Sequence, residues 1–213
     1  MSKPSITFLG QSGFLLQCQD SSLLIDPQNK TAGNREGEIV YCTHDHSDHV
    51  GGVNVFMKHN PVAFLMGSTQ VAKKFRKWTH RTVVVRDGEI VQQGPWTLRF
   101  IQEPHGFFKS KVNLGVIVRT EDFAFGHVGD AVQFNGFASA KLDVLAIPIS
   151  GGFTASPKQT IEELKKFDSP LPTIVPIHWV IRSPSGFCKQ LKQQIPKASC
   201  IVPTKNKSLP LES

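Results

Sequence analysis

The sequence lacks several features that would point to secretion, membranes or cysteine chemistry. No apolar run is long enough to cross a membrane, and the amino terminus has no apolar core of a secretion signal. The four cysteines contain no CxxC pair, so a cysteine-based zinc site is not indicated. We therefore expect a cytoplasmic protein without a membrane partner, in which all cysteines are reduced. They are Cys18, Cys42, Cys188 and Cys200.

The chain also lacks internal boundaries. No Ser/Gly-rich linker, low-complexity tract or short repeat interrupts it, and we expect a single domain spanning residues 1–213. A hydrophobic fraction of 39% and a charged fraction of 19% are ordinary for a soluble globular domain. The net charge of +7 favours anionic substrates or weak association with nucleic acid, although a solvated basic surface is its commoner meaning.

The segment 43–49 carries the clearest chemical signal. It reads THDHSDH and places three imidazoles and two carboxylates within seven residues. A strand pattern at 38–42 precedes it and a helix pattern begins near Gly51, so it is a strand-to-helix loop of the kind that presents reactive groups. Imidazoles and carboxylates suit zinc, manganese or iron. Four ligands this close together do not fit one tetrahedral ion, so the segment favours two metal ions.

Further candidate ligands stand at the ends of predicted strands, or shortly after them. They are His105, His127, Asp130 and His178. Imidazoles and carboxylates that loops hold at strand ends converge on one edge of a sheet. These residues are therefore candidates to complete the metal site.

The predicted elements are β-hairpins mixed with β-α units in both halves of the chain. This order predicts two mixed sheets with helices outside. Within it we expect a loop at 28–37, a helix at 68–78, a helix at 156–167 that begins with a capping box, and a last strand at 199–202.

Together these residues resemble the metallo-β-lactamase-fold hydrolases. The resemblance rests on the run His44-x-His46-x-Asp48-His49, followed in order by His105, Gly129-Asp130 and Pro176-Ile177-His178. The segments 6–10, 24–27 and 148–154 further resemble the branch that contains ascorbate 6-phosphate lactonase-like and N-acylphosphatidylethanolamine-phospholipase-like proteins. The resemblance implies an α/β (α+β) fold, a four-layer αβ/βα sandwich of two mixed sheets with outer helices, and metals at the shared edge of the sheets.

The resemblance also implies which side chains hold the metals. Each ion would take three ligands of its own and share a carboxylate. The ligands are His44, His46 and His105 for the first ion, Asp48, His49 and His178 for the second, and Asp130 as the bridge. Three departures remove no ligand but bear on the substrate. Gln11 stands where the branch often has histidine, Ala131 where it has threonine, and Trp179 where it has tyrosine.

This ligand set points to hydrolysis. Two divalent ions about 3.5–4 Å apart can share a bridging hydroxide, lower the pKa of water toward about 7, and polarise a carbonyl or phosphoryl oxygen. We expect the hydroxide to attack an ester, lactone or phosphoester of a small anionic substrate. Zinc is the first choice of metal, with manganese or iron as alternatives. Asp48 and Asp130 are the expected catalytic residues, and Asp48 would also orient the hydroxide.

Substrate contacts are predicted around the segment 43–49, which we call the metal loop. The candidates are Gln11, His127, Phe153, Thr154 and Trp179. His127 is equally expected as a core histidine, and the segment with Phe153 and Thr154 as an ordinary turn before a helix N-terminus.

Four other polar residues have a predicted role near the ligands. Asp26 would orient a ligand imidazole, or else serve a turn. Lys109, Lys111 and Arg182 lie near the ligands in sequence and are candidates to bind an anionic group, although solvated lysines are commoner.

Two other functions stay open. A nuclease or phosphodiesterase is compatible with the charge. However, the chain is too short for the RNA-binding domain or protruding arm of the nucleases it resembles, and we expect no basic stretch with interleaved aromatic residues. The other function is a metal-binding or regulatory protein without turnover, against which the complete ligand set argues. The expected partner is a small-molecule substrate rather than nucleic acid, and a homo-oligomer is compatible with the resembling branch.

Overall fold

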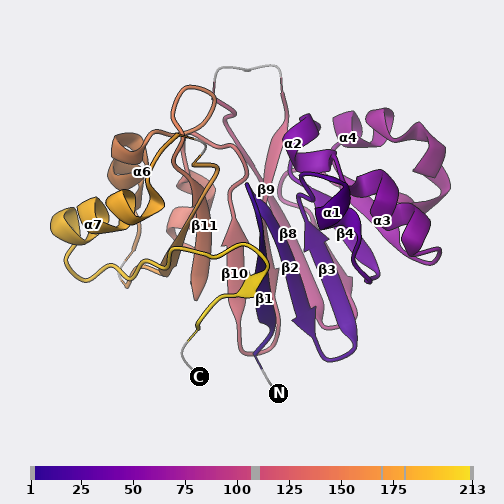
Figure 1. Cartoon of the computed structure of the whole chain (residues 1–213), viewed down its shortest axis with the longest axis horizontal. Helices are drawn as coiled ribbons and strands as arrows, with labels where there is room; N and C mark the ends of the chain where they lie inside the picture. The colour runs from indigo at the N-terminus through magenta and orange to yellow at the C-terminus, as the bar shows by residue number, and fades with distance from the viewer. Residues whose placement is uncertain (1–2, 107–110, 169, 180, 212–213) are drawn as a thin grey trace.

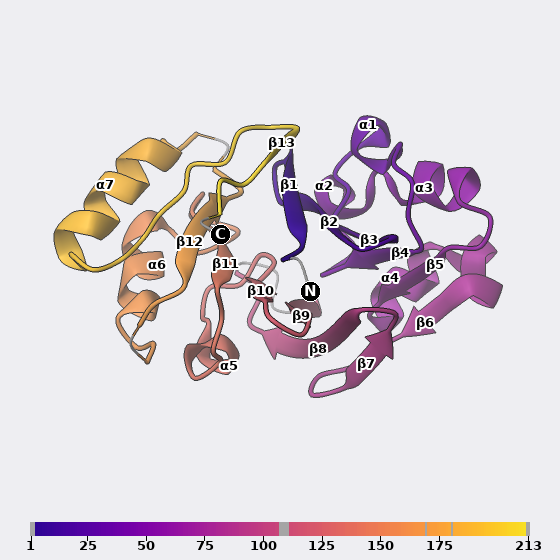
Figure 2. The ribbon, with the colours of Figure 1, turned by 90° about the horizontal axis from the view of Figure 1, so that it is seen from below.

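The computed structural model describes residues 3–106, 111–168, 170–179 and 181–211. Two β-sheets pack against each other and helices cover the outer side of each sheet, as Figure 1 and Figure 2 show in two perpendicular views. The predicted sandwich of two mixed sheets with outer helices is therefore confirmed.

The first sheet is antiparallel on one side and parallel on the other. Its strand order is β13-β1-β2-β3-β4-β5-β6, antiparallel from β13 to β3 and parallel from β3 to β6. The strands are β1 (Ser5–Gly10), β2 (Gly13–Cys18), β3 (Ser21–Ile25), β4 (Ile39–Cys42), β5 (Phe64–Gly67), β6 (Thr82–Val84) and β13 (Lys207–Ser208). The metal loop 43–49 follows β4, a strand that is buried at every position.

The second sheet mixes the two pairings in the same way. Its order is β12-β11-β10-β9-β8-β7, parallel from β12 to β10 and antiparallel from β10 to β7. The strands are β7 (Ile90–Gln93), β8 (Trp96–Glu103), β9 (Asn113–Arg119), β10 (Ala124–His127), β11 (Val144–Pro148) and β12 (Thr173–Ile177). Because β9 is antiparallel to both of its neighbours, β8 runs in the same direction as β10, β11 and β12.

The helices form the two outer layers. In Figure 2, α1 and α3 lie outside the first sheet, and α6 and α7 lie outside the second. The helices are α1 (Lys30–Gly33), α2 (Ser47–Val50), α3 (Val53–His59), α4 (Thr69–Lys74), the 3-10 helix η1 (Arg76–Arg81), α5 (Asn135–Ala138), α6 (Pro157–Leu164) and α7 (Pro184–Gln194). The predicted capping box opens α6, where Ser156 and Gln159 cap each other's backbone N–H. Within the described ranges, no helix has the length and apolarity to cross a membrane.

Three apolar clusters hold the four layers together. The largest lies between the sheets, where Trp96, Leu98 and Phe100 of β8 face inward at a period of two residues. The other two lie between each sheet and its helices, and include Phe56 of α3 and Leu191 of α7. Complete burial of such a side chain stabilises the fold by about 1.5–3 kcal/mol. The packed layers therefore give the strand ends fixed positions.

Two connecting segments differ from the prediction. The loop expected at 28–37 contains α1, because the Asn29 side chain caps this helix by accepting the N–H of Ala32 at 3.0 Å. The last strand expected at 199–202 is a single bridge between Cys200 and β12, and β13 forms the last strand instead. In both cases a cap or a distant partner decides the structure, rather than local hydrophobic periodicity.

The helix expected at 68–78 is shorter than predicted. It begins at the predicted N-cap, where Ser68 accepts the N–H of Val71. The α-helix ends at Lys74, because Phe75 leaves the helical conformation with φ −110° and ψ 40°. The chain continues as η1, so the predicted helix consists of the six-residue α-helix α4 followed by a 3-10 helix.

The expectation that all cysteines are reduced was wrong for one pair. Cys188 of α7 and Cys200 form a disulfide, with their Cα atoms 5.6 Å apart. Only the fold brings these two segments within bonding range, and no sequence spacing announces it. Cys18 and Cys42 are free and buried. The disulfide ties α7 to the chain that lies beside β12.

Candidate metal centre

The predicted ligands lie together at one edge of the two sheets. Residues 44–49 follow β4, His105 follows β8, Asp130 follows β10, and His178 follows β12. The last three strands run in the same direction, so their carboxyl ends meet at this edge beside the end of β4. The structure thus brings together the seven residues of the implied ligand set, but not His127, which the strand-end pattern also made a candidate.

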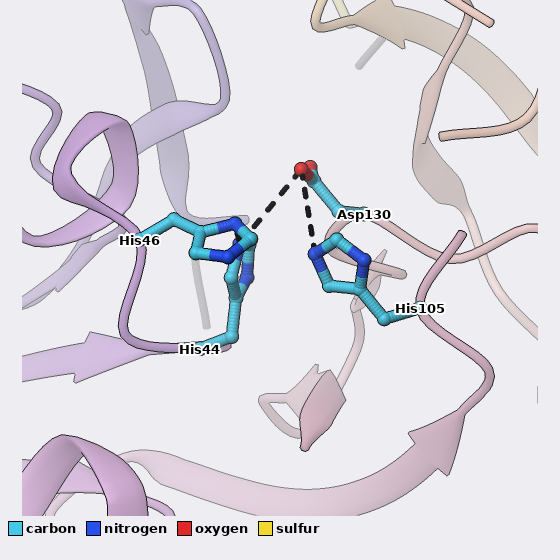
Figure 3. Close-up of side chains that lie close together, drawn as sticks. All are labelled: His44, His46, His105 and Asp130. Carbon is cyan, nitrogen blue, oxygen red and sulfur yellow. Dashed lines mark hydrogen bonds and ion pairs between the residues drawn. The ribbon is translucent and has the colours of Figure 1, made fainter. Parts of the chain in front are cut away.

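One cluster consists of three imidazoles and a carboxylate (Figure 3). His44, His46, His105 and Asp130 each offer a ligand atom, and these atoms lie within 4.8 Å of one another. The Nε2 atoms of His44 and His105 lie 3.8 and 3.9 Å from Oδ2 of Asp130, and Nδ1 of His46 lies 3.1 Å from Nε2 of His44. Ligand atoms that each lie about 2.0–2.2 Å from one zinc ion are separated by similar distances.

The second cluster lies beside the first and shares a carboxylate with it. In this cluster Nε2 of His178 lies 3.2 Å from Oδ2 of Asp48, and Nε2 of His49 lies 3.9 Å from the same oxygen. Asp130 approaches both rings, with Oδ1 3.2 Å from Nε2 of His49 and Oδ2 3.4 Å from Nε2 of His178. Asp130 therefore contacts both clusters.

Several buried atoms of this centre have no hydrogen-bond partner among the described residues, and two of them lie opposite each other. They are Nε2 of His49 and Oδ1 of Asp130, which face each other at 3.2 Å. Buried polar atoms are almost always hydrogen-bonded, and a cation held between these two would satisfy both. The mixed imidazole and carboxylate set is one that zinc, manganese and iron accept. The residues therefore fit divalent ions.

Asp26 fixes the orientation of a predicted ligand. Its Oδ2 lies 2.7 Å from Nδ1 of His49 and accepts the Thr43 hydroxyl at 2.7 Å, while its Oδ1 accepts the Thr43 N–H at 2.8 Å. A carboxylate at Nδ1 holds the ring so that Nε2 faces the second cluster. Of the two roles considered from the sequence, this geometry supports the orienting one.

Asn113 positions Asp130, and no sequence pattern points to it. Its Oδ1 accepts the N–H of Asp130 at 3.0 Å, and its Nδ2 donates to the carbonyl of Val128 at 3.0 Å. Gly129 has φ +65°, and a Cβ at this position would lie 2.2 Å from Oδ1 of Asn113. Glycine is therefore required here for both conformation and space. A buried asparagine at the start of a strand carries no signal by itself, so the sequence could not reveal this contact.

The imidazoles of the two clusters differ in their preferred charge. Burial lowers the pKa of His44 well below its usual range and also lowers the pKa of His46 and His105. Burial opposes a charge on His49 and His178 as well, but the neighbouring carboxylates outweigh it and raise the pKa of both. Without metal, the first three rings prefer the neutral form that binds metals, whereas His49 and His178 retain protons that a metal would have to displace.

These opposite shifts predict that the metal-free protein has its greatest free energy of unfolding near pH 6.5, about the usual histidine pKa. Below this pH the unfolded chain takes up protons that the folded chain refuses at His44, His46 and His105, so stability falls as the pH falls. Above it the folded chain retains protons at His49 and His178 that the unfolded chain loses, so stability falls as the pH rises. Urea denaturation of EDTA-treated protein between about pH 5 and about pH 8 measures both arms. A free energy of unfolding that rises steadily over this range would contradict the prediction.

Gln11 lies against the second cluster. Its Nε2 donates to Oδ2 of Asp48 at 3.1 Å, and its backbone carbonyl accepts the N–H of His178 at 2.9 Å. It occupies the tip of the β1–β2 hairpin with φ 54°, in the left-handed region. The hairpin tip therefore positions two predicted ligands, and the Gln11 side chain is already engaged by one of them.

Replacing Gln11 with asparagine is expected to weaken metal binding at the second cluster by about 10–100-fold. The shorter side chain does not reach Asp48, and asparagine tolerates a positive φ, so the fold is retained. Calorimetric metal titration gives the affinity. Gln19→Asn is the matched control, because Gln19 is exposed and has the same φ of 54°. Equal affinities in the two variants would show that Gln11 does not support the cluster.

His127, a predicted substrate contact, is a core histidine in the structure. It is fully buried, its Nδ1 accepts the N–H of Gly129 at 3.0 Å, and its Nε2 donates to the carbonyl of Ser12 at 2.8 Å. Burial lowers its pKa, in agreement with a neutral ring. Both ring nitrogens are used by the backbone, so neither is left to bind a substrate.

Phe153 and Thr154 differ in their access to the centre. A Cβ on Gly106 would lie 2.2 Å from the carbonyl oxygen of Phe153, so this loop packs beside His105. The Phe153 side chain is 55% exposed, whereas Thr154 is buried with its hydroxyl 2.9 Å from that of Ser150. The Phe153 side chain is therefore accessible to solvent, whereas Thr154 supports the loop from inside. Trp179 is half-buried and packs on the inner core.

Two of the three cationic candidates, Lys111 and Arg182, have partners within the protein. Nζ of Lys111 pairs with the Asp45 carboxylate at 2.9 Å. Nε of Arg182 donates to the carbonyl of Ser150 at 3.4 Å, and the residue is exposed. Lys109 lies outside the described residues.

The sandwich and the seven clustered side chains define the class of metallo-β-lactamase-fold hydrolases. A family model described as "Beta-lactamase superfamily domain" matches residues 5–178, and the chain belongs to this superfamily. The UPF0173 metal-dependent hydrolase of Sulfurisphaera tokodaii is 26% identical, over 94% of this chain and 97% of its own. A UPF0173 protein of Pyrococcus abyssi is also 26% identical, over 89% and 91%.

Solved structures show the same fold. Igni18, a metallo hydrolase from Ignicoccus hospitalis, superposes with a TM-score of 0.80 at 19% identity and covers 97% of both chains. The metallo-beta-lactamase fold protein YhfI from Bacillus subtilis gives 0.81 at 15% identity, over 97% of this chain and 99% of its own. The narrower resemblance to the ascorbate 6-phosphate lactonase-like branch stays a prediction.

Proposed function

We propose that the protein is a hydrolase that uses two divalent metal ions, most simply zinc, to cleave an ester, lactone or phosphoester of a small anionic substrate. The position of Asp130 carries this proposal. Its carboxylate lies within 3.2–3.9 Å of four imidazoles that belong to both clusters. A carboxylate between two groups of three ligands suits a binuclear centre. The name metal-dependent hydrolase, carried by the relative from Sulfurisphaera tokodaii, agrees with it.

In this proposal each cluster would hold one ion. The ligands would be His44, His46 and His105 for the first ion, Asp48, His49 and His178 for the second, and Asp130 for both. When bound, the ions would acidify water and polarise the substrate oxygen that gains negative charge. Manganese or iron would serve the same ligands.

The two carboxylates have different parts in this proposal. The Asp48 side chain is 43% exposed and that of Asp130 only 3%. Burial raises the pKa of both, but His49 and His178 outweigh it, so both pKa values lie well below the usual range. Asp48 would orient the attacking water, because its side chain is open to solvent. Asp130 would fix the position of the two clusters relative to each other.

The surroundings of the metal loop support an anionic substrate. Lys74 donates to the backbone carbonyl of Asp45, and Lys111 pairs with the carboxylate of the same residue. Arg182 extends from the loop that follows His178. These cations would attract a negatively charged substrate toward the open side of the centre.

A screen of metal-loaded protein tests the proposal. The protein is loaded with zinc, manganese or iron and assayed against lactones, esters and p-nitrophenyl phosphodiesters, and its metal content is measured. We expect two ions per chain and turnover that EDTA abolishes and added metal restores. His46→Ala should lose both metal and activity, whereas His80→Ala, at an exposed histidine of η1, should lose neither. Less than one ion per chain after loading would favour a protein without turnover, and full activity without metal would refute the mechanism.

A further inference from the structure

The positive charge of this protein is concentrated in one segment. Between Asp48 and Asp87 the sequence contains seven lysines and arginines and no acidic residue. The net charge of the whole chain is +7, so the rest of the sequence is balanced. The seven residues are Lys58, Lys73, Lys74, Arg76, Lys77, Arg81 and Arg86.

Four of these cations crowd onto α4 and the start of η1. Lys73, Lys74, Arg76 and Lys77 are all exposed, on the helical segment that packs against β5 and β6. Like charges three or four residues apart on a helix repel each other. None of the four forms an ion pair with a carboxylate of the described residues. We call these four residues the basic face.

Trp78 orders the cations beside it and does not offer its ring to a ligand. Nζ of Lys77 lies 5.1 Å and Cζ of Arg81 4.8 Å from the centre of the ring, and Nε1 donates to the Asn54 side chain at 3.0 Å. Phe75 is buried. Neither aromatic ring beside the basic face is therefore free to stack on a base. Recognition of a partner by the basic face would rest on its charge.

The basic face begins at the rim of the metal centre. The ammonium group of Lys74 donates to the backbone carbonyl of Asp45, which lies between two predicted ligands. From there the cations continue outward along α4 and η1. A partner with a single negative charge would use only one of these positions, whereas a chain of phosphates would use several at once.

We propose that the basic face binds the phosphate backbone of nucleic acid without sequence preference. Lysine and arginine that contact phosphates release the counterions condensed on the nucleic acid, which supplies the affinity of such binding. The expectation that no basic stretch carries interleaved aromatic residues was wrong, since residues 73–78 read KKFRKW. This inference goes beyond the proposed hydrolysis and does not depend on bound metal.

Binding of a short fluorescein-labelled oligo(dT) by EDTA-treated protein, followed by anisotropy at several salt concentrations, tests this proposal. We expect a Kd of roughly 10⁻⁶–10⁻⁴ M near physiological salt, and log K that falls with log salt with a slope of about −3 for four phosphate contacts. The triple variant K73Q/R76Q/K77Q should bind about tenfold or more weakly, with a slope smaller by about 2.

The control is K158Q/K189Q/K192Q, which removes three exposed lysines from α6 and α7 over the other sheet. It lowers the net charge by the same amount and should bind like the unmodified protein. Absent binding, equal weakening of both triple variants, or binding to vesicles of anionic phospholipid but not to oligo(dT) would overturn the proposal. Because EDTA-treated protein is used, failure of the hydrolase proposal would leave this result unchanged.

Discussion

Asp130→Ala is expected to lower kcat/KM by about 10³-fold or more and to leave at most one tightly bound metal ion per chain. Among the described residues, Asp130 is the carboxylate that lies 3.2–3.9 Å from imidazoles of both clusters. Loss of a shared ligand weakens both ions and removes several kcal/mol of transition-state stabilisation, which corresponds to this loss of rate. Metal analysis after gel filtration and steady-state kinetics on the substrate found in the screen measure the two effects.

Two further variants show whether the effect comes from the charge of Asp130, from its shape, or from loss of any carboxylate. Asp130→Asn keeps the shape of the side chain and the backbone bond to Asn113, but loses the charge, so it should also lose metal. Asp20→Ala removes an exposed carboxylate from the β2–β3 turn and should retain both metal and activity. Two ions per chain in Asp130→Asn, with a normal rate, would remove the basis of the binuclear assignment.

Asp26→Ala is expected to have the largest effect on stability. The variant leaves the buried His49 ring without its carboxylate and the Thr43 N–H without its acceptor. Breaking a buried charged pair costs about 3–5 kcal/mol. Metal affinity at the second cluster should fall by about 10–100-fold as well, because His49 is no longer oriented. Urea denaturation and calorimetric metal titration measure the two quantities.

Asp26→Asn is the matched variant. Asparagine can still accept the N–H of Thr43 with its amide oxygen, its amide N–H can donate to the Thr43 hydroxyl, and it tolerates the positive φ of 45° at this position. It should therefore keep most of the stability while it weakens metal binding. If Asp26→Ala and Asp26→Asn were equally destabilised, the charge on Asp26 rather than its hydrogen bonds to Thr43 would account for the loss.

Much of the sandwich was predictable because its signals are local. The apolar run of β11 and the capping box of Ser156 and Gln159 lie within a few residues, and the structure follows both. Local signals were insufficient where residues distant in sequence determine the ends of helices or the pairing of strands. The end of α4 at Phe75 and the pairing of β13 with β1 depend on packing that no window of sequence contains.

In the candidate site, too, the residues with a local sequence signal were predicted and those placed by distant contacts were not. Histidines and aspartates at strand ends were sufficient to nominate the ligands, because their order and spacing are unusual. The residues that position the ligands could not all be identified from the sequence. Asn113 has no sequence signal, and only the fold places it against Asp130. For His127 the sequence left two interpretations open, and the structure supports the core histidine. A histidine after a strand has the same appearance in sequence whether it faces a substrate or the backbone of Ser12 and Gly129.

The candidate ligands are divided between the two sheets. Those of the loop 43–49 are attached to the first sheet, whereas His105, Asp130 and His178 are attached to the second. Ions shared across this division would clamp the halves of the molecule together at one edge, and a ligand at a hundred times its Kd adds about 2.7 kcal/mol to the state that binds it. Removal of metal would then loosen this edge first, with faster amide hydrogen exchange at the ends of β4 and β12, while the core beneath stays closed.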